Sequence, residues 1–570
     1  MTGLLARANA RARDALSRGG PLELGRQLTS IRRWQRFLHL VMNRGRDLDA
    51  QYERWLSKAR MSDEQVRTAL GRLSKPPRIT AWLLPSSAGV DEGFDGAAQT
   101  IHAQAFPPVD IRPFGREPRH DEVDSDFVLL LYPDVRVDPL ALLHVAHLVT
   151  QPEVPDLIYF DEDRLGGQGR YQPFFKPDWD IDLHRGYDYL GRCVVARRAA
   201  IEAVGGLRPA LGPNMLYDLE LRMTGSSTAR VAHIPAPLFS IVEHSDPAEE
   251  RTQGTLAAVV AEEAQKDPRV ARVDAGSLRG STRVHYQILD RTTVGIVIPT
   301  RDRLPLLRRC ISSVLERSTY RNFQIIVVDN DSQEAETLDY MEKMPIMVVR
   351  CGGAFNFSKA LNQAAGESSS DVLLFLNNDT EVRSPDWLEA MLEHCLRAEV
   401  GVVGARLVYP DGTPQHEGVG IDRRGNVVNL VFPDHIPLGM TVRRCSDVSA
   451  ACMMLRRSVF DGLGGFDTEL KVGYNDVDLC LRAVRQGYAV VYTPYAELLH
   501  EESASRGRAH PTRDERFFRA RWDTDDPFED EFMNPNLVAE TPLRIDERAA
   551  KNLPRFLFHD VLDSGPILES

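Results

Sequence analysis

Three apolar runs in the second half of the chain end on polar residues, and this pattern predicts strands of one buried sheet. The runs cover residues 294–300, 325–329 and 372–376. Near-continuous apolar runs of this length are typical of parallel strands that are covered on both faces. Ligands bind at the carboxyl ends of such strands, so we expect the residues there to converge on one crevice. These residues are Thr300, Arg301, Asp329, Asn330, Asn377, Asn378 and Asp379.

An internal repeat relates this second α/β pattern to a first one upstream. Residues 193–211 match residues 452–470 without a gap, and both segments place Arg-Arg and then Gly-Gly at equal distances. Residues 218–222 match 478–482, and Leu131-Tyr-Pro-Asp134 matches Leu376-Asn-Asn-Asp379. Agreement at this many fixed offsets predicts a tandem duplication of one α/β domain.

The pattern divides the chain into five parts. Apolar positions recur at helical spacing in residues 31–41, with Arg between them, and the Pro pair after Lys75 ends this helical region. The expected division is a helical basic region at 1–77, a first domain at 78–250, a connector at 251–290, a second domain at 291–510 and a C-terminal extension at 511–570.

Charge and cysteine content limit the class of protein. The net charge of −13 argues against nucleic acid as a partner, yet residues 1–46 carry ten Arg against two acidic residues. The N-terminal helix therefore packs on the next domain or lies at an anionic membrane surface. No apolar run approaches the ~18 residues of a membrane span, the N-terminus lacks a secretory signal, and the seven Cys form no CxxC pair. We expect a cytoplasmic protein, with peripheral contact at the inner face of the cell membrane as one option.

Asp379, His500 and Asp476 are the residues of the second domain whose types suggest chemistry. Asp379 follows a strand and stands beside amide oxygens, which suits a hard divalent cation, although a turn-capping role fits the same position. His500 ends an apolar run and alone would more often be a packed residue. Asp476 and Asp478 begin a helix, where carboxylates also serve as caps, but two acids exceed what capping needs.

The second domain carries an ordered set of segments: PTRDR, VVDNDS, FNFSKALNQA, LNNDTEV, the Gly-Gly-Phe-Asp run, YNDVDLCLR and the terminal His before SASRG. Through these segments it resembles glycosyltransferase family 2, with the GT-A fold, of the bacterial polysaccharide type. Residues 127–240 resemble the first domain often fused ahead of it. The implied fold is α/β, with two tandem GT-A (Rossmann-like, mixed mostly parallel sheet) domains and an α-helical N-terminal region.

The resemblance implies an inverting transferase that uses Mg²⁺ or Mn²⁺ and a nucleoside diphosphate sugar donor. Asp379 and His500 would hold the metal, Asp476 would be the base, and Asp478 would contact the acceptor or support the helix start. One departure is that Asn377 and Asn378 precede Asp379, where two carboxylates are frequent. The residues implied to bind the donor are Pro299, Thr300, Arg301, Asp329, Asn330, Asn362, Asn378 and Arg506.

The first domain is expected to be degenerate. Leu216 stands opposite Asp476 and Ile241 opposite His500, although Asp134 keeps the place of Asp379. No upstream strand ends in Val-Asp-Asn, and only 49 residues separate Pro85 from Asp134, so about one βα element is missing. A second active site with unusual residues is the alternative.

The favoured function is sugar transfer to a glycan or lipid-linked acceptor during surface polysaccharide or lipopolysaccharide synthesis. Acceptor type is not written in any motif, so a glycosyltransferase acting on a flagellin or adhesin remains open. A non-catalytic glycan-binding scaffold is the alternative from a different class. Against it, the second domain keeps the base, the metal Asp and the His together, whereas the first has lost two of the three.

Overall fold

The computed structural model describes residues 48–550 apart from several internal stretches. The expected helix at 31–41, its membrane contact through residues 1–46, and Arg506 lie outside the described residues. The stretches left out are 74, 86–93, 115–124, 226–227, 243–252, 290, 354, 423, 434–435, 502–511, 523–529 and 541–542, together with both termini. Among the described residues, no helix is long and apolar enough to span a bilayer.

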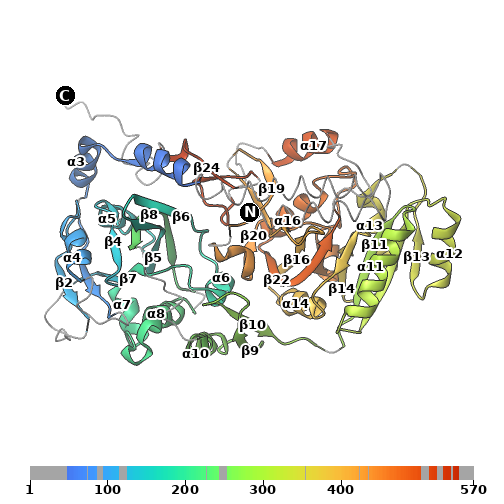
Figure 1. Cartoon of the computed structure of the whole chain (residues 1–570), viewed down its shortest axis with the longest axis horizontal. Coiled ribbons are helices and arrows are strands. Elements are labelled where there is room, and N and C mark those ends of the chain that lie inside the picture. The colour runs from blue at the N-terminus through green and yellow to red at the C-terminus, as the bar shows by residue number, and fades with distance from the viewer. Residues whose placement is uncertain are drawn as a thin grey trace, which may run out of the picture.

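The first unit is built on a mixed sheet, drawn in blue and green in Figure 1. Its strands run in the order β2-β1-β3-β7-β5-β8-β4, with β6 paired to β5. The strand bounds are β1 Ile79–Leu83, β2 Asp110–Pro113, β3 Phe127–Leu131, β4 Val135–Val137, β5 Leu157–Gly166, β6 Gly169–Phe174, β7 Cys193–Arg197 and β8 Val231–Val242. Its helices are α3 Asp63–Gly71, α4 Phe94–His102, α5 Ala141–Leu148, α6 Ile181–Gly186, α7 Arg198–Ala203 and α8 Met215–Thr224, preceded by a further helix at 48–59.

The second unit repeats this order with two more strands. The path is β13-β12-β11-β14-β21-β16-β22-β15, with β17 paired to β16 and β20 to β22. The strands are β11 Val294–Thr300, β12 Phe323–Asp329, β13 Met347–Arg350, β14 Val372–Leu376, β15 Thr380–Val382, β16 Val400–Val408, β17 Pro414–His416, β20 Arg443–Cys445, β21 Cys452–Arg456 and β22 Ala489–His500. The helices are α11 Leu304–Arg317, α12 Ala335–Lys343, α13 Phe357–Glu367, α14 Trp387–Cys395, α15 Arg457–Gly462 and α16 Asn475–Arg485.

The two sheets agree in strand direction as well as order. β7 and β21 each run antiparallel to both of their neighbours, while the pairs β5–β8 and β16–β22 are parallel. The edge strands β4 and β15 are also antiparallel to their neighbours β8 and β22. A mostly parallel sheet with an antiparallel strand in its middle is the arrangement expected for the GT-A fold. The expected fold class, two such α/β units in tandem with the first reduced, is confirmed.

The first unit keeps more of the sheet than its sequence indicates. β2 occupies the place of β12, although no upstream strand ends in Val-Asp-Asn. All four positions of β2 are half-buried, and it ends on Pro113. A short edge strand with a terminal proline lacks the apolar pattern by which strands are recognised. Within the described residues, two strands of the second sheet lack a counterpart in the first, namely β13 and β20.

The strands form because their side chains are covered on both faces. Every residue of β3 and of β14 is buried, as the near-continuous apolar runs predict. The α11 helix supplies one cover, since Leu307, Cys310 and Val314 recur at helical spacing and are buried against the sheet.

The connector expected at 251–290 joins the two units. It folds as α10 (Gln253–Ala264) followed by a hairpin of β9 (Val270–Ala275) and β10 (Thr282–Tyr286). A buried ion pair reinforces the joint, because Arg397 donates to both carboxylate oxygens of Asp182 on α6 at 2.8 and 3.0 Å. Two parallel hydrogen bonds between the partners offset part of the desolvation free energy that burial of the two charges costs.

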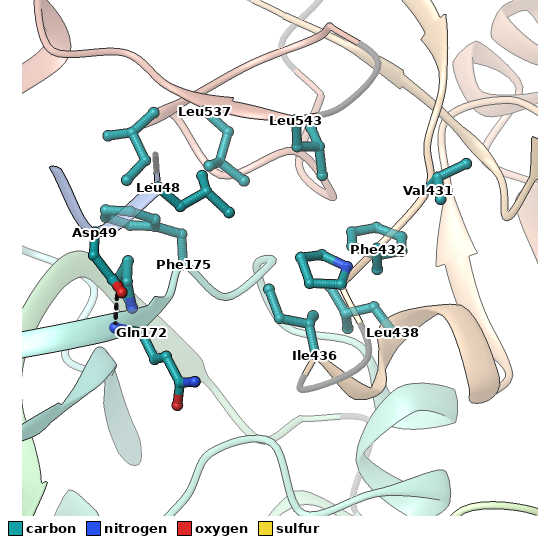
Figure 2. Close-up of a pocket in the computed structure, with 13 residues that line it drawn as sticks. Leu48, Asp49, Gln172, Phe175, Val431, Phe432, Ile436, Leu438, Leu537 and Leu543 are labelled. Carbon is teal, nitrogen blue, oxygen red and sulfur yellow. Dashed lines mark hydrogen bonds between the residues drawn. The ribbon is translucent and has the colours of Figure 1, made fainter. Parts of the chain in front are cut away.

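The C-terminal segment returns to the first unit, so regions far apart in sequence lie side by side (Figure 1). Asn534 donates to the Asp161 carboxylate at 3.0 Å, and Asn536 donates to the carbonyl of Pro235 at 2.7 Å. Figure 2 shows an apolar pocket where the helix at 48–59, the first unit, the second unit and this segment meet, lined by Leu48, Phe175, Phe432, Leu438, Leu537 and Leu543 among others.

Candidate functional site

The strand ends of the second unit converge as the sequence predicts. Thr300 at the end of β11 and Asp329 at the end of β12 are register partners. Asn378, after β14, donates from its side-chain amide to Thr300 Oγ1 at 2.9 Å, and the backbone N–H of Asn330 donates to the Thr300 carbonyl at 2.9 Å. Pro299 is half-buried beside them. Five of the predicted donor-binding residues therefore meet at one sheet edge.

The loop after β11 is held in a strained conformation. Asp302 and Arg303 have positive φ angles of 53° and 60°, and the Asp302 carboxylate accepts hydrogen bonds from the backbone N–H groups of Gln333 and Glu334. Left-handed backbone at non-glycine residues carries strain that clusters at functional sites. Arg301 stands exposed at the start of this loop, where its charge is available to an anionic ligand.

Asp379 and His500 face each other across the β15–β22 ladder. Nε2 of His500 lies 3.3 Å from Oδ1 of Asp379, which is buried and accepts no hydrogen bond from the residues that the structure describes. Nδ1 of His500 lies 2.7 Å from Oε1 of Gln415, whose amide nitrogen donates to the His500 carbonyl. That second contact turns Oε1 of Gln415 toward Nδ1 of His500, which favours a proton on Nδ1 and a lone pair on Nε2 that faces the carboxylate.

Two acceptors that face each other at this distance require a positive charge between them. A divalent cation about 2.1 Å from each atom fits a separation of 3.3 Å, and a proton on Nε2 is the alternative. The carboxylate–imidazole pair and the oriented second nitrogen are what a metal site uses. The residues present therefore fit the expected metal.

Residues 449–451 connect Asp476 to the segment that carries Asp379. The carboxylate of Asp476 accepts from the backbone N–H of Ala450 at 3.1 Å, while the N–H of Asn377 donates to the carbonyl of Ala451 at 3.0 Å. Asp476 is half-buried in the first turn of α16, two residues after Tyr474, whose φ is 60°. A strained turn thus holds the partly exposed carboxylate of Asp476 near Asp379 and His500.

Asp478 has a different environment. It is fully buried and accepts from Arg482, Arg521 and the indole N–H of Trp522, at 2.8, 2.8 and 3.2 Å. A fully buried carboxylate that three structural donors hold is not accessible to a substrate. Of the two roles expected for Asp478, the geometry favours support of the helix start.

Asn362 also makes structural contacts. Its amide donates to the carbonyl of Phe466 and accepts from the N–H of the same residue, at 2.7 and 2.9 Å. It thereby fixes the turn at Gly465, where φ is 71° and a Cβ atom would lie 2.7 Å from Asn362 Oδ1. Contact of Asn362 with the donor stays a prediction.

Gln415 and His416, on the short strand β17, belong to the site but were missed from the sequence. His416 accepts from the backbone N–H of Ser449 at 3.4 Å, and burial lowers its pKa to about 4, so it is neutral. The sequence pattern that could have identified them is Pro414-Gln-His-Glu417, because three consecutive polar residues in a short strand indicate a role other than packing.

Asp447 is the second residue that sequence reasoning missed. Its side chain is buried, and burial followed by the nearby Asp476 carboxylate raises its pKa well above the ordinary range. A protonated carboxyl group therefore lies below the candidate base.

The first unit fills the equivalent positions differently. Ile241 pairs with Val135 in the register in which His500 pairs with Thr380, so Ile241 stands at the imidazole position. The Nε atom of Arg192 lies 2.9 Å from the carboxylate of Asp134. A guanidinium thus supplies the positive charge at this carboxylate.

Comparison with known protein families gives a match within the second unit. Residues 295–464 match the family described as Glycosyl transferase family 2, and the second unit is a domain of that family. The chain is 38% identical over 399 residues to the O-antigen biosynthesis protein RfbC of Myxococcus xanthus, covering 67% of this chain and 31% of that protein. The chain thus spans about a third of that relative's length.

Two further matches cover smaller parts. An N-acetylglucosaminyl-diphospho-decaprenol L-rhamnosyltransferase of Mycobacterium tuberculosis is 26% identical over 238 residues, covering 37% of this chain and 77% of that protein. A crystal structure of GalNAc-T7 with UDP, GalNAc and Mn²⁺ aligns with a TM-score of 0.36 at 18% identity, covering 44% of this chain and 51% of that one.

Proposed function

We propose that the second unit transfers a sugar, with inversion, from a nucleoside diphosphate sugar to a glycan or lipid-linked acceptor in surface polysaccharide or lipopolysaccharide synthesis. The observation that carries this proposal is the 3.3 Å separation between Nε2 of His500 and the buried Oδ1 of Asp379, an oxygen without a hydrogen-bond partner among the described residues. This pair lies beside the strand ends that hold Thr300 and Asp329, which suit the nucleoside.

Each residue has a separate task in the proposed reaction. Asp379 and His500 would hold Mg²⁺ or Mn²⁺, which when bound neutralises the charge that develops on the departing diphosphate. Asp476 takes the proton from the acceptor hydroxyl as that oxygen attacks the anomeric carbon. The backbone N–H groups of Ala450 and Val477 each hold one carboxylate oxygen of Asp476, and the remaining lone pairs of this half-buried side chain can face the acceptor.

The lipid-linked acceptor draws support from a relative. The name of the mycobacterial relative describes a decaprenol-linked acceptor and a rhamnosyl group. For this chain the sugar is open, so a test has to cover UDP-, GDP- and dTDP-sugars.

A thermal-shift panel of nucleotide sugars with and without Mn²⁺ tests the proposal. A ligand that binds only the folded state raises its stability, by about 2.7 kcal/mol at a hundredfold excess over Kd. We expect one nucleotide class to raise the melting temperature of the wild type in a Mn²⁺-dependent way. Asp379→Ala should lose this shift, and Asp134→Ala is the matched control that should keep it. A shift of equal size in Asp379→Ala would contradict the proposal.

A further inference from the structure

The first unit contains a cluster of metal-ligating side chains that the proposed reaction does not use. His184, Asp188 and Glu220 are all buried, and one ligand atom from each lies within 4.8 Å of the other two. Among the described residues, this is the place where three such side chains meet so closely. Nε2 of His184 lies 3.6 Å from Oε2 of Glu220, beyond ordinary hydrogen-bond length.

The repeat relates this cluster to the floor of the candidate active site. The gapless match of Cys193 with Cys452 places Asp188 opposite Asp447, and the match of Asp218 with Asp478 places Glu220 opposite Cys480. The second unit has an acid and a thiol at this depth, whereas the first unit has two acids and an imidazole. The first unit has therefore lost the imidazole opposite His500 but carries a different set of potential metal ligands, His184, Asp188 and Glu220.

The surroundings fix the imidazole in place. The rings of Trp179, Tyr189 and Tyr217 lie 5.2, 5.8 and 5.0 Å from that of His184. Asp188 is held where its chain turns, because its Oδ1 accepts from the N–H of Gly191 at 3.3 Å. An aromatic wall of this kind limits solvent access and reduces the reorganisation that binding of an ion requires.

The donor set selects the kind of ion. One nitrogen and two carboxylates suit zinc, because imidazole binds transition metals whereas Mg²⁺ and Ca²⁺ prefer oxygen alone. Zinc–ligand bonds of about 2.1 Å in a tetrahedron give ligand atoms about 3.4 Å apart, close to the observed 3.6 Å. The two carboxylates offer four oxygen atoms, so a tetrahedral set can be completed without another side chain.

We propose that His184, Asp188 and Glu220 bind a structural Zn²⁺ ion that fastens α6 to α8 at the joint between the units. α6 also carries Asp182, which pairs with Arg397 of the second unit, and Arg185, which pairs with Glu263 of the connector at 2.8 Å. An ion held beneath α6 therefore stabilises the element on which the joint depends. Full burial excludes a substrate, so the role is structural.

Metal content of the full chain provides the test. The protein is refolded with Zn²⁺, dialysed against metal-free buffer, and measured by mass spectrometry for bound zinc. We expect about one tightly held Zn²⁺ per chain. Glu220→Gln and Asp188→Asn should lose it. Asp379→Ala should keep it, which separates this site from the proposed catalytic metal. Glu263→Gln is the matched control, because it removes a buried carboxylate of the same joint that is not a ligand.

A second measurement decides the matter if the ligand variants do not fold. Wild type loaded with Co²⁺ should show the visible absorption of a tetrahedral N/O site, and chelation should lower its melting temperature in a way that added Zn²⁺ reverses. Zinc-free wild type after refolding in Zn²⁺ would overturn the proposal, since it would mean that His184 and Glu220 form only an ion pair. Folded Glu220→Gln that retains one Zn²⁺ would overturn it equally.

Discussion

The two units differ in the side chain that lies beside the carboxylate at the end of the equivalent strand, Asp134 in the first unit and Asp379 in the second. Asp134 meets the guanidinium of Arg192, whereas Asp379 meets the imidazole of His500. The first carboxylate lies beside a permanent cation of the protein. The second lies beside a ligand that can share a metal ion with it, and for this reason we propose the chemistry for the second unit.

Replacement of the candidate base tests the role of Asp476. Asp476→Asn removes the proton acceptor but keeps the size and one hydrogen-bonding oxygen, so donor binding should change little. Turnover should fall roughly 10²–10⁴-fold, the usual contribution of a positioned base. Donor hydrolysis rates and nucleotide affinity measured on the same variant check this.

Asp478→Asn is the control for that experiment. Asp478 pairs with Arg482 and Arg521, so its loss should lower the melting temperature rather than act on the chemical step. Wild-type turnover by Asp476→Asn would reduce Asp476 to a helix cap.

The pH dependence of stability tests Asp447. Its folded pKa is raised, mainly by burial and then by Asp476. The folded state therefore holds a proton that the unfolded state releases from about pH 4 upward, and stability falls as the pH rises. Asp447→Asn keeps a neutral side chain at every pH. The melting temperature of the variant, relative to wild type, should be more favourable at pH 8 than at pH 5. An equal difference at both pH values would mean that Asp447 is ionised in the folded protein.

Secondary-structure elements show which parts of the molecule could be predicted from the sequence. The strands that carry the site were predictable because both faces are covered, which leaves a continuous apolar run ending on polar residues such as Asp329 and Asp379. The repeat then indicated which positions the first unit lacks, and the register of Ile241 agrees.

Contacts between distant segments could not be predicted in this way. Gln415 meets His500 across 85 residues, and Asp182 meets Arg397 across 215. Neither pair has a local pattern, because the partners are brought together by the packing of whole elements. The raised pKa of Asp447 has the same origin, since burial is a property of the fold rather than of the neighbouring sequence.

The joint between α6 and the second unit can be tested at its buried ion pair. Asp182 and Arg397 are 5% and 4% exposed, so Arg397→Ala leaves a buried carboxylate with less compensation. We expect a loss of about 3 kcal/mol in the free energy of unfolding. Removal of both charges, in Asp182→Leu with Arg397→Met, should cost less than the single change. Denaturant unfolding of the full chain measures both. A single variant as stable as wild type would show that this ion pair does not stabilise the joint.

The whole molecule consists of two related units, of which one keeps the proposed chemistry. The first unit supports the second through the connector, the ion pair on α6 and the C-terminal segment that returns to Asp161. The reduced sheet, the isoleucine at the imidazole position and the arginine beside Asp134 are consistent with a supporting role.

The most direct measurement compares Asp379→Ala with Asp134→Ala for Mn²⁺-dependent hydrolysis of the donor sugar, with the melting temperature of each variant recorded alongside. Asp379→Ala should abolish most of the activity, because the proposed metal loses its carboxylate. Asp134→Ala should stay within a few-fold of wild type, because it removes only a partner of Arg192. A folded but inactive Asp134→Ala beside an active Asp379→Ala would mean that the first unit, and not the second, carries the reaction.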